Sequence, residues 1–424
     1  MKNTLNFLIK VNKLKEVPKT GWVLMKVKNP ETIADHVFRV AIASWLLGEK
    51  KKLNIEKAIK IALSHDLCEV YAGDSTPFFY WEGLDRDKKK DEEILLKGTR
   101  LSKEEKEKRG KTKLTKEKKA LSKLIKSLKP ELKREILSAW FHYEKRMSKE
   151  GRFVKQIDRI ETLLQSIEYF GTQKNRGGTS WWEGTEEIVE DPLLLDFLKV
   201  IQKKFYGKVP GGYKKQKELE NILDFLSEIG KLKRTSRLYW TIRGVKSPET
   251  VAGHIFTLSL MAWIFGRDKK LKLNMEKLLK MALCHELTAV HTGDTTPYDE
   301  ILPRSSKKRE EILKRWPRLL KAKKTRIFLK NYKEEKKALQ KLTLKLKPSL
   351  KKEIIQLWEE YRTRSSPESH FLSQLNTFAV LFQALLYREK DKRFSTVPLW
   401  EWVFEISDNL TSFELIEAMK KRFG

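Results

Sequence analysis

The sequence predicts an all-α protein made of two tandem helical bundles. Apolar residues recur at spacings of three and four over most of the 424 residues, and the alternation that is typical of strands is rare. A second observation is an internal repeat, in which the motifs of the first half return in the same order in the second half. Each half therefore predicts one helical bundle of its own.

The repeat has a nearly constant offset. His36 corresponds to His254 (254 − 36 = 218), and Trp140 corresponds to Trp358 (358 − 140 = 218). The matching segments are residues 30–36 (PETIADH) and 248–254 (PETVAGH), 65–77 (HDLCEVYAGDSTP) and 285–297 (HELTAVHTGDTTP), and 128–133 (LKPELK) and 346–351 (LKPSLK). The chain is thus a tandem duplication of one domain.

The boundary between the copies is predicted from turn-forming residues. Residues 207–213 (GKVPGGY) are rich in Gly and Pro and show no apolar period. We therefore predict a first domain over 1–207, a linker over 208–216 and a second domain over 217–424. Such a short linker keeps the two copies close neighbours.

The formal net charge of +32 permits two interpretations. Clustered Lys and Arg side chains displace counterions from phosphate backbones, which indicates a nucleic-acid partner. The alternative, which we favour, is a solvated surface on which Lys and Glu interleave, as in residues 103–109 and 333–337. Each half also carries a long lysine-rich helical insert, about 86–127 and 304–345. The positive side chains of these inserts could line the site or face water, and we favour a solvated face.

The sequence predicts a cytoplasmic protein without a membrane span. No apolar run approaches the roughly 20 residues that a bilayer requires, and the first residues do not resemble a signal peptide. Cys68 and Cys284 both lie inside apolar helical patterns, so we expect reduced, buried thiols.

One short stretch concentrates ionisable side chains. Read as a continuous helix that Gly73 ends, the segment places His65, Asp66 and Glu69 on one face, beside an apolar stripe. An adjacent His-Asp pair offers a neutral nitrogen and an anionic oxygen to one metal ion, and Glu69 can reach a water bound to that ion. Asp74 follows at the mouth of the same site. The alternative is a hydrogen-bonded core histidine beside a solvated acidic face.

Two further residues favour the metal site. His36 lies in an otherwise apolar predicted helix for which Thr32 is a candidate cap, and Asp158 lies on the flank of an apolar helix farther along the chain. A carboxylate on such a flank is costly to bury unless it is paired.

The two copies differ at these positions. The second copy keeps the histidines as His254 and His285 but has Glu286 for Asp66, Ala289 for Glu69 and Asn376 for Asp158. An amide is a poorer ligand than a carboxylate, and alanine moves no proton. We therefore expect the second copy to keep the fold and lose the chemistry.

The order of His36, then His65-Asp66, then Asp158 on separate helices resembles the HD-domain metal-dependent phosphohydrolases. Residues 19–22 (KTGW), with 65–69 (HDLCE) followed by 73–77 (GDSTP), are similar to the branch that contains the 5′-deoxynucleotidases. The resemblance covers nearly all of the first half.

The resemblance implies a mechanism with named roles. His36, His65, Asp66 and Asp158 would hold one divalent ion in an octahedral shell, for which Mn, Co, Fe or Mg suits this ligand set better than a structural Zn. Glu69 would transfer a proton, and Asp74 would orient the attacking water.

The resemblance also implies substrate contacts. Ser75 and Thr76 would donate hydrogen bonds to phosphate, and Trp22 would crowd the sugar and select deoxyribose. A plain core aromatic is the alternative for Trp22, because Trp240 persists in the second copy.

One position departs from the family pattern. Bacterial members carry an arginine directly before that tryptophan, whereas this chain has Gly21. Lys19 or Lys26 is the candidate replacement for the phosphate contact.

The expected function is hydrolysis of (deoxy)nucleoside 5′-monophosphates to nucleoside and phosphate. The alternatives are a basic nucleotide- or nucleic-acid-binding protein with a vestigial HD site, or an HD phosphohydrolase that acts on another phosphate ester.

Relatives of this branch commonly pair as homodimers, so the duplication predicts an intramolecular pseudo-dimer in which the second copy is a permanent partner. The tryptophan-rich residues 179–183 and 399–402 match at the same offset (400 − 182 = 218) and are candidates for the shared face. The rival interpretation is that the second copy is an independent regulatory nucleotide binder.

Overall fold

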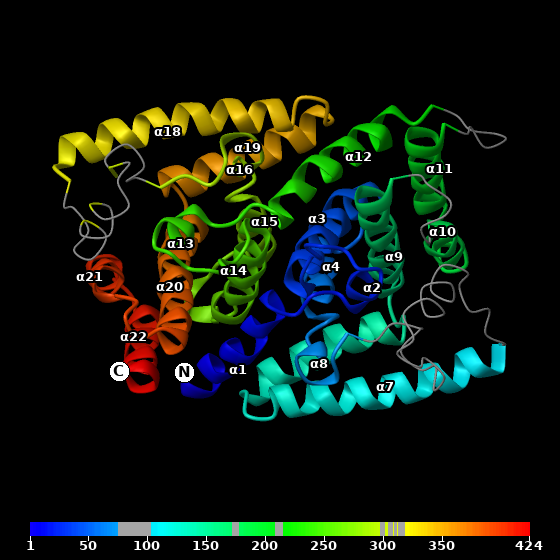
Figure 1. Ribbon diagram of the computed structural model, residues 1–424, viewed down its shortest axis with the longest axis horizontal. Helices are drawn as coiled ribbons and strands as arrows, with labels where there is room; N and C mark the ends of the chain where they lie inside the picture. Colours follow the sequence, from blue (N-terminus) through cyan, green and yellow to red (C-terminus); the bar gives the residue numbers. More distant parts are fainter. Residues whose placement is uncertain are drawn as a thin grey trace. The chain divides into compact units, whose positions relative to one another are not determined.

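The computed structural model describes residues 1–74, 103–171, 178–207, 215–296, 302–303, 308, 312 and 319–424. Helices form nearly all the regular structure in this part of the chain (Figure 1). Its β pairing is limited to two isolated bridges, Pro18 with Thr32 and Ser236 with Thr250, which occupy matching places in the two copies. The predicted all-α class is confirmed.

Backbone contacts divide the chain into two compact units. The first unit is Lys10–Ser227, and the second unit is Met1–Ile9 together with Glu228–Gly424. Residues 217–227, which the repeat assigns to the second copy, thus group with the first unit. The predicted linker lies mostly outside the described residues, so the sequence boundary at 208–216 stays a prediction.

The first unit takes its helices from the first copy and the start of the second. In chain order they are α1 (Lys2–Asn12), which crosses the division after Ile9, η1 (Lys13–Lys15), α2 (Thr20–Leu24), α3 (Ile33–Lys50), α4 (Ile55–Ser64), α5 (Glu69–Ala72), α7 (Lys103–Ile125), α8 (Pro130–Glu144), α9 (Lys149–Phe170), α10 (Gly178–Glu186), α11 (Pro192–Tyr206) and α12 (Lys217–Ile229), which ends beyond Ser227.

Helix α3 is the central element of the first unit. Its start is fixed by a capping box, in which the Thr32 hydroxyl accepts from the Asp35 backbone N–H and the Asp35 carboxylate accepts from the Thr32 N–H. Residues 33–48 are all buried, and α3 packs against both α4 and α9 (Figure 1). The cap predicted at Thr32 is therefore confirmed, and α3 places His36 inside the core.

The HD motif does not lie within a continuous helix, contrary to the sequence-based expectation. Helix α4 ends at Ser64, whose hydroxyl donates to the Lys60 carbonyl at 2.8 Å, and α5 begins only at Glu69. His65 and Asp66 occupy the tight turns between the two helices. Gly73 ends α5 with φ +73°, a conformation that favours glycine, as predicted.

Helix α9 is set closely against the end of α8. A Cβ atom built on Gly151 would lie 1.9 Å from the carbonyl oxygen of His142. The close approach brings Tyr143 of α8 beside Asp158 of α9, with the Tyr143 hydroxyl 2.6 Å from Asp158 Oδ2. Gly151 therefore helps to position a predicted metal ligand.

The second unit repeats the same order of helices. They are η4 (Gly230–Lys233), α13 (Leu238–Ile242), α14 (Val251–Gly266), η5 (Lys269–Leu271), α15 (Met275–Cys284), α16 (Ala289–Thr292), α18 (Lys321–Leu342), α19 (Pro348–Thr363), α20 (Pro367–Lys390), α21 (Val397–Ile406) and α22 (Leu410–Phe423). Thr250 caps α14 as Thr32 caps α3, accepting from the Gly253 N–H at 2.8 Å.

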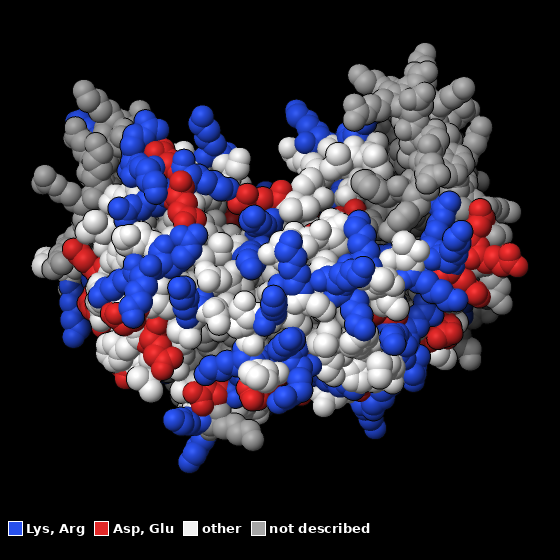
Figure 2. All heavy atoms as spheres, turned by 90° about the horizontal axis from the view of Figure 1, so that it is seen from below, with Lys and Arg blue, Asp and Glu red and all other residues white. Residues whose placement is uncertain are grey.

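The surface carries positive charge over a wide area. Figure 2 shows Lys and Arg side chains distributed over the face it presents, with Asp and Glu side chains among them. Most of the described residues of α7 and α18 are exposed, as expected for the lysine-rich inserts. In the described part of the chain, no helix is both long and apolar enough to span a bilayer. Cys68 and Cys284 are both buried free thiols, as predicted.

The contact between α8 and α9 generates a stability prediction. Gly151→Ala forces a methyl group against a backbone oxygen that cannot rotate away, so we expect a loss of about 1–3 kcal/mol in the free energy of unfolding. Gly184→Ala is the matched control, because nothing lies within 4 Å of its added Cβ. Urea denaturation of both variants measures the difference. Equal stabilities would show that α8 and α9 do not need this close approach.

Candidate metal centre

The structure brings all four predicted metal ligands together. His36 comes from α3, His65 and Asp66 from the turns after α4, and Asp158 from α9. His36 Nε2 lies 3.0 Å from Asp158 Oδ1 and 3.9 Å from Asp66 Oδ2, while His65 Nε2 lies 3.2 Å from Asp66 Oδ2. The ligand atoms of His36, His65 and Asp66 all lie within 4.8 Å of one another, and Asp158 adjoins this cluster through its contact with His36.

The hydrogen bonds of His65 fit a metal ligand. Its Nδ1 lies 2.6 Å from the carbonyl oxygen of Ala62, so Nδ1 carries the proton and donates it. Nε2 then carries a lone pair, is buried, and has no hydrogen-bond partner among the described residues. A lone pair that faces the Asp66 carboxylate is unfavourable unless a cation lies between the two. The donor set therefore fits a divalent ion.

The carboxylates of the cluster are ionised at neutral pH. Burial alone would raise the pKa of Asp66, but a positive charge on the His65 ring, present when Nε2 is protonated, and the Lys19 ammonium hold it well below its usual range. Burial likewise opposes ionisation of Asp158, and the hydrogen bond and charge of His36 outweigh it and lower the pKa of that carboxyl. Both oxygens that a metal would use are therefore charged.

His36 is enclosed by anions. Its Nδ1 contacts Glu161 Oε2, and its Nε2 contacts Asp158 Oδ1. Burial alone would lower the pKa of His36, but the Glu161 and Asp158 carboxylates raise it to about 10. The surroundings of this ring therefore favour a positive charge at its position, which a proton or a metal ion can supply.

Glu69 is a buried carboxyl beside the predicted ligands. It is 6% exposed, and its Oε2 atom has no hydrogen-bond partner in the described part of the chain. Burial, reinforced by the nearby Asp66 carboxylate, raises the pKa of Glu69 well above its usual value. The raised pKa favours the protonated form, which is the form that a general acid requires.

Lys19 lies at the centre of three carboxylates. Its Nζ atom is 3.2 Å from Asp66 Oδ2, 3.4 Å from Asp74 Oδ1 and 4.0 Å from Glu69 Oε1. Burial alone would lower the pKa of Lys19, and the carboxylates reverse this effect and raise it. The ammonium is therefore charged and adjacent to the predicted metal ligands.

Asp74 also has a local structural role. Its Oδ2 atom accepts from the Thr20 backbone N–H at 2.5 Å, and its carbonyl oxygen accepts from the Thr20 hydroxyl at 3.0 Å. These bonds attach the start of α2 to the end of α5. Ser75 and Thr76, the predicted phosphate contacts, lie outside the described residues.

Trp22 packs in an aromatic cluster. It is 2% exposed, its Nε1 atom donates to Glu31 Oε1 at 2.8 Å, and its ring centroid lies 5.3 Å from Tyr169 and 4.9 Å from Trp181. Trp240 makes the equivalent bond to Glu249 at 2.8 Å. The packing is that of a core aromatic, and a contact with the sugar of a substrate stays a prediction.

The second copy retains the geometry with different chemistry. His254 Nε2 lies 2.8 Å from Asn376 Oδ1, and His285 Nδ1 lies 2.7 Å from the Ala282 carbonyl oxygen. Glu286 is directed toward a cation instead of a histidine, since its Oε1 atom is 3.1 Å from Arg237 and 3.9 Å from His285 Nε2. Arg237 occupies the position that Lys19 has in the first copy.

Sequence reasoning missed three residues that contact the predicted ligands. Tyr143 donates to Asp158, Glu161 contacts His36, and Arg39 donates from Nε to Glu161 Oε1 at 2.8 Å. For Arg39 and Glu161, the spacing in the sequence pointed to a contact with a predicted ligand. Arg39 follows His36, and Glu161 follows Asp158, by three residues, which places each on the same helical face as its neighbour.

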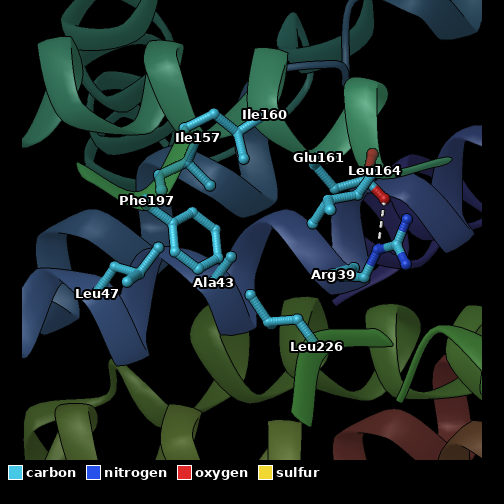
Figure 3. A pocket seen from close by; sticks show the side chains of 9 residues that line it. All are labelled: Arg39, Ala43, Leu47, Ile157, Ile160, Glu161, Leu164, Phe197 and Leu226. Carbon is cyan, nitrogen blue, oxygen red and sulfur yellow. Dashed lines mark hydrogen bonds and ion pairs between the residues drawn. The ribbon is translucent and has the colours of Figure 1, made fainter. Parts of the chain in front are cut away.

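A small hollow lies next to this charged pair (Figure 3). It is bounded mainly by apolar side chains of α3, α9, α11 and α12, including Phe197 and Leu226. Arg39 and Glu161 line it, but none of the four predicted ligands does. The hollow is therefore a packing defect behind the site and not a substrate pocket.

The contrast between the copies predicts one ion per chain. His65→Ala should abolish Mn²⁺ or Co²⁺ binding, because it removes a buried lone pair directed at Asp66. The matched variant His285→Ala should leave binding unchanged, since Glu286 is paired with Arg237. Isothermal titration calorimetry gives the stoichiometry, and circular dichroism checks that helix content is kept. Two ions per chain, or a loss of binding in His285→Ala, would contradict this prediction.

Comparisons with known proteins identify relatives of this chain. The HD-domain family profile matches residues 11–184 and again residues 229–409. The chain is 34% identical over 201 residues to 5′-deoxynucleotidase HDDC2 of Xenopus laevis. These residues are 86% of that protein and 47% of this chain. It is 33% identical over 223 residues to HDDC2 of Danio rerio, covering 98% of that protein and 52% of this chain. Its identity to 5′-deoxynucleotidase hdd1 of Schizosaccharomyces pombe is 30% over 202 residues, which is 88% of that protein and 47% of this chain.

Each of these relatives has about the length of one copy, and the family profile fits both copies. HD domains are metal-dependent, in agreement with the cluster of His36, His65 and Asp66, whose ligand atoms all lie within 4.8 Å of one another. The chain belongs to the HD-domain family, as a tandem duplication related to the 5′-deoxynucleotidases.

Proposed function

We propose that the first copy is a metal-dependent phosphomonoesterase that hydrolyses deoxynucleoside 5′-monophosphates to nucleoside and phosphate. The observation that carries this proposal is the complete ligand set of His36, His65, Asp66 and Asp158 beside a buried, protonatable Glu69. The relationship to 5′-deoxynucleotidases supplies the substrate class.

The four ligands would hold one divalent ion. Two imidazoles and two carboxylates suit Mn, Co, Mg or Fe better than a four-coordinate structural Zn. When bound, the ion supplies Lewis-acid chemistry, neutralising the phosphate and lowering the pKa of a water. The ionised state of Asp66 and Asp158 favours its binding.

Glu69 is the proposed proton donor to the leaving 5′ oxygen. Its raised pKa keeps a proton available, and its uncommitted Oε2 atom can direct that proton to a substrate. Asp74 is the proposed orienting group for the attacking water. Its carboxylate is held in place by the Thr20 N–H and by Lys19.

Substrate contacts complete the proposal. Lys19 is the phosphate contact that compensates for Gly21, since its charged Nζ lies 3.2–4.0 Å from the carboxylates of the site. Ser75 and Thr76 would donate to the phosphate, and Trp22 would limit the space at the sugar. Lys26 is the second candidate and lies beyond the end of α2.

The high positive charge gives less support to nucleic-acid binding. On the face that Figure 2 presents, Lys and Arg side chains lie among acidic side chains. A titration with single-stranded DNA at several salt concentrations tests this alternative. The two buried thiols are consistent with a reducing cytoplasm, which stays our expectation for the location.

We further propose that the second copy serves as a permanent partner of the first. Its differences in chemistry, with Glu286 paired to Arg237 and Ala289 in place of Glu69, support a structural instead of a catalytic role. A duplication can supply both members of a pseudo-dimer from one chain. Regulatory nucleotide binding by the second copy is the rival proposal.

Phosphate release from a panel of ribo- and deoxyribonucleoside 5′-monophosphates tests the activity. We expect turnover only with added Co²⁺, Mn²⁺, Mg²⁺ or Fe²⁺, a preference for deoxyribose, and no turnover in His65→Ala. The His285→Ala variant serves as the active control. Equal turnover in His65→Ala and the unmodified protein would remove the proposal.

Glu69→Gln should separate metal binding from proton transfer. The amide keeps the size of the side chain but cannot donate an acidic proton, so we expect a rate loss of about a hundredfold or more with metal affinity retained. Single-turnover phosphate release and calorimetry on the same sample measure the two quantities. A parallel loss of metal affinity would identify Glu69 as a ligand instead.

Isolated fragments test the partner role. A fragment of residues 1–207 lacks Leu226, which lines the hollow of the first unit, so we expect it to be less stable than a fragment of residues 10–227. Both fragments should self-associate if the second copy is a permanent partner. Analytical ultracentrifugation decides the point, since a stable and fully active monomer would favour the independent binder.

A further inference from the structure

The ring of His36 must present one nitrogen to a metal, and the surrounding contacts determine which one. A neutral imidazole carries its proton on one nitrogen and its lone pair on the other. Glu161 Oε2 contacts Nδ1, on the opposite side of the ring from Asp158, which contacts Nε2. Both nitrogens thus face a carboxylate, and when a cation binds beside Asp158 the Nε2 proton is displaced, while the Glu161 carboxylate keeps the proton on Nδ1 and leaves the Nε2 lone pair for the cation.

Glu161 is itself held by a buried arginine. Arg39 Nε donates to Glu161 Oε1 at 2.8 Å, as Figure 3 shows. The same guanidinium donates to Gln165 Oε1 at 3.0 Å and to Glu168 Oε1 at 2.5 Å. All three acceptors lie on one face of α9, and both Arg39 and Glu161 are almost completely buried. Glu161 therefore has little freedom to turn away from His36.

The second copy lacks this arrangement. Ala379 stands in the place of Glu161 (379 − 161 = 218), and Thr257 stands in the place of Arg39 (257 − 39 = 218). The amide nitrogen of Asn376 donates to the Tyr361 hydroxyl at 2.9 Å, so its Oδ1 atom accepts from His254. The proton of His254 is then on Nε2, the nitrogen that His36 would offer to a metal.

We propose that Glu161, fixed by Arg39, is a positioning residue that sets the tautomer of His36 for metal binding, and that the second copy lost metal binding partly through losing this pair. This inference rests on the metal site of the proposed function but does not depend on the identity of the substrate. A metal-bound histidine that donates its other N–H to a carboxylate is a more basic and better oriented ligand.

The test is the Co²⁺ affinity of the full-length apoprotein, measured by calorimetry, together with the visible absorption of the Co²⁺ complex. We expect Glu161→Ala to weaken binding about 10- to 100-fold and to change the spectrum. Glu150→Gln is the matched control, because Glu150 is also a buried carboxylate of α9 but pairs with Lys57 at 3.3 Å. It should bind Co²⁺ like the unmodified protein.

Glu161→Gln guards against a folding artefact. Its amide oxygen can still accept from Nδ1, but without the negative charge, so we expect an intermediate affinity. If Glu161→Ala loses its helical circular dichroism, the Co²⁺ affinity and spectrum of Glu161→Gln test the inference in its place. Unchanged affinity and spectrum in the folded variants would overturn the inference. Unmodified protein that binds Co²⁺ but hydrolyses no nucleotide would remove the proposed function alone.

Discussion

The structure of the first unit depends on the burial of two basic side chains of α3 against α9. His36 and Arg39 lie one turn apart, and both are fully enclosed. A buried charge without a partner lowers the stability of the fold by about 3–5 kcal/mol. Helix α9 must therefore present carboxylates directly opposite His36 and Arg39. Asp158 and Glu161 meet this requirement, and the register between the two helices follows from it. The same register places the predicted metal ligands of α3 and α9 opposite each other.

The second copy shows how much of this chemistry the fold can lose. It keeps the order of the helices, the cap of α14 and the paired histidines. At the position of Arg39 it has Thr257, and at that of Glu161 it has Ala379, so a cation and its anion are absent together. Removing both partners of a buried pair avoids the cost of leaving one charged, which explains why the bundle tolerates the exchange.

A cation beside the HD motif is common to both copies. Lys19 in the first copy and Arg237 in the second each precede a short helix. Each pairs with the aspartate that directly follows the glycine turn, Asp74 or Asp294. In the second copy, the longer side chain of Glu286 also turns to Arg237 at 3.1 Å. The acidic cluster of the second copy is thereby neutralised by the protein itself, whereas the first copy retains carboxylates in excess of its lysine.

The sequence by itself determined the helical class and the duplication, because helical period and repeat offset can be read from the residues alone. The resemblance to the HD family and the comparison of the two copies indicated His36, His65, Asp66 and Asp158 as the predicted ligands. Only the tertiary structure decided that the HD motif lies in turns between α4 and α5, that residues 217–227 group with the first unit, and that Glu161 and Arg39 lie behind His36. The pairing of Arg39 with Glu161, for example, joins residues 122 positions apart in the sequence. No local pattern encodes which charged face of one helix meets which face of another.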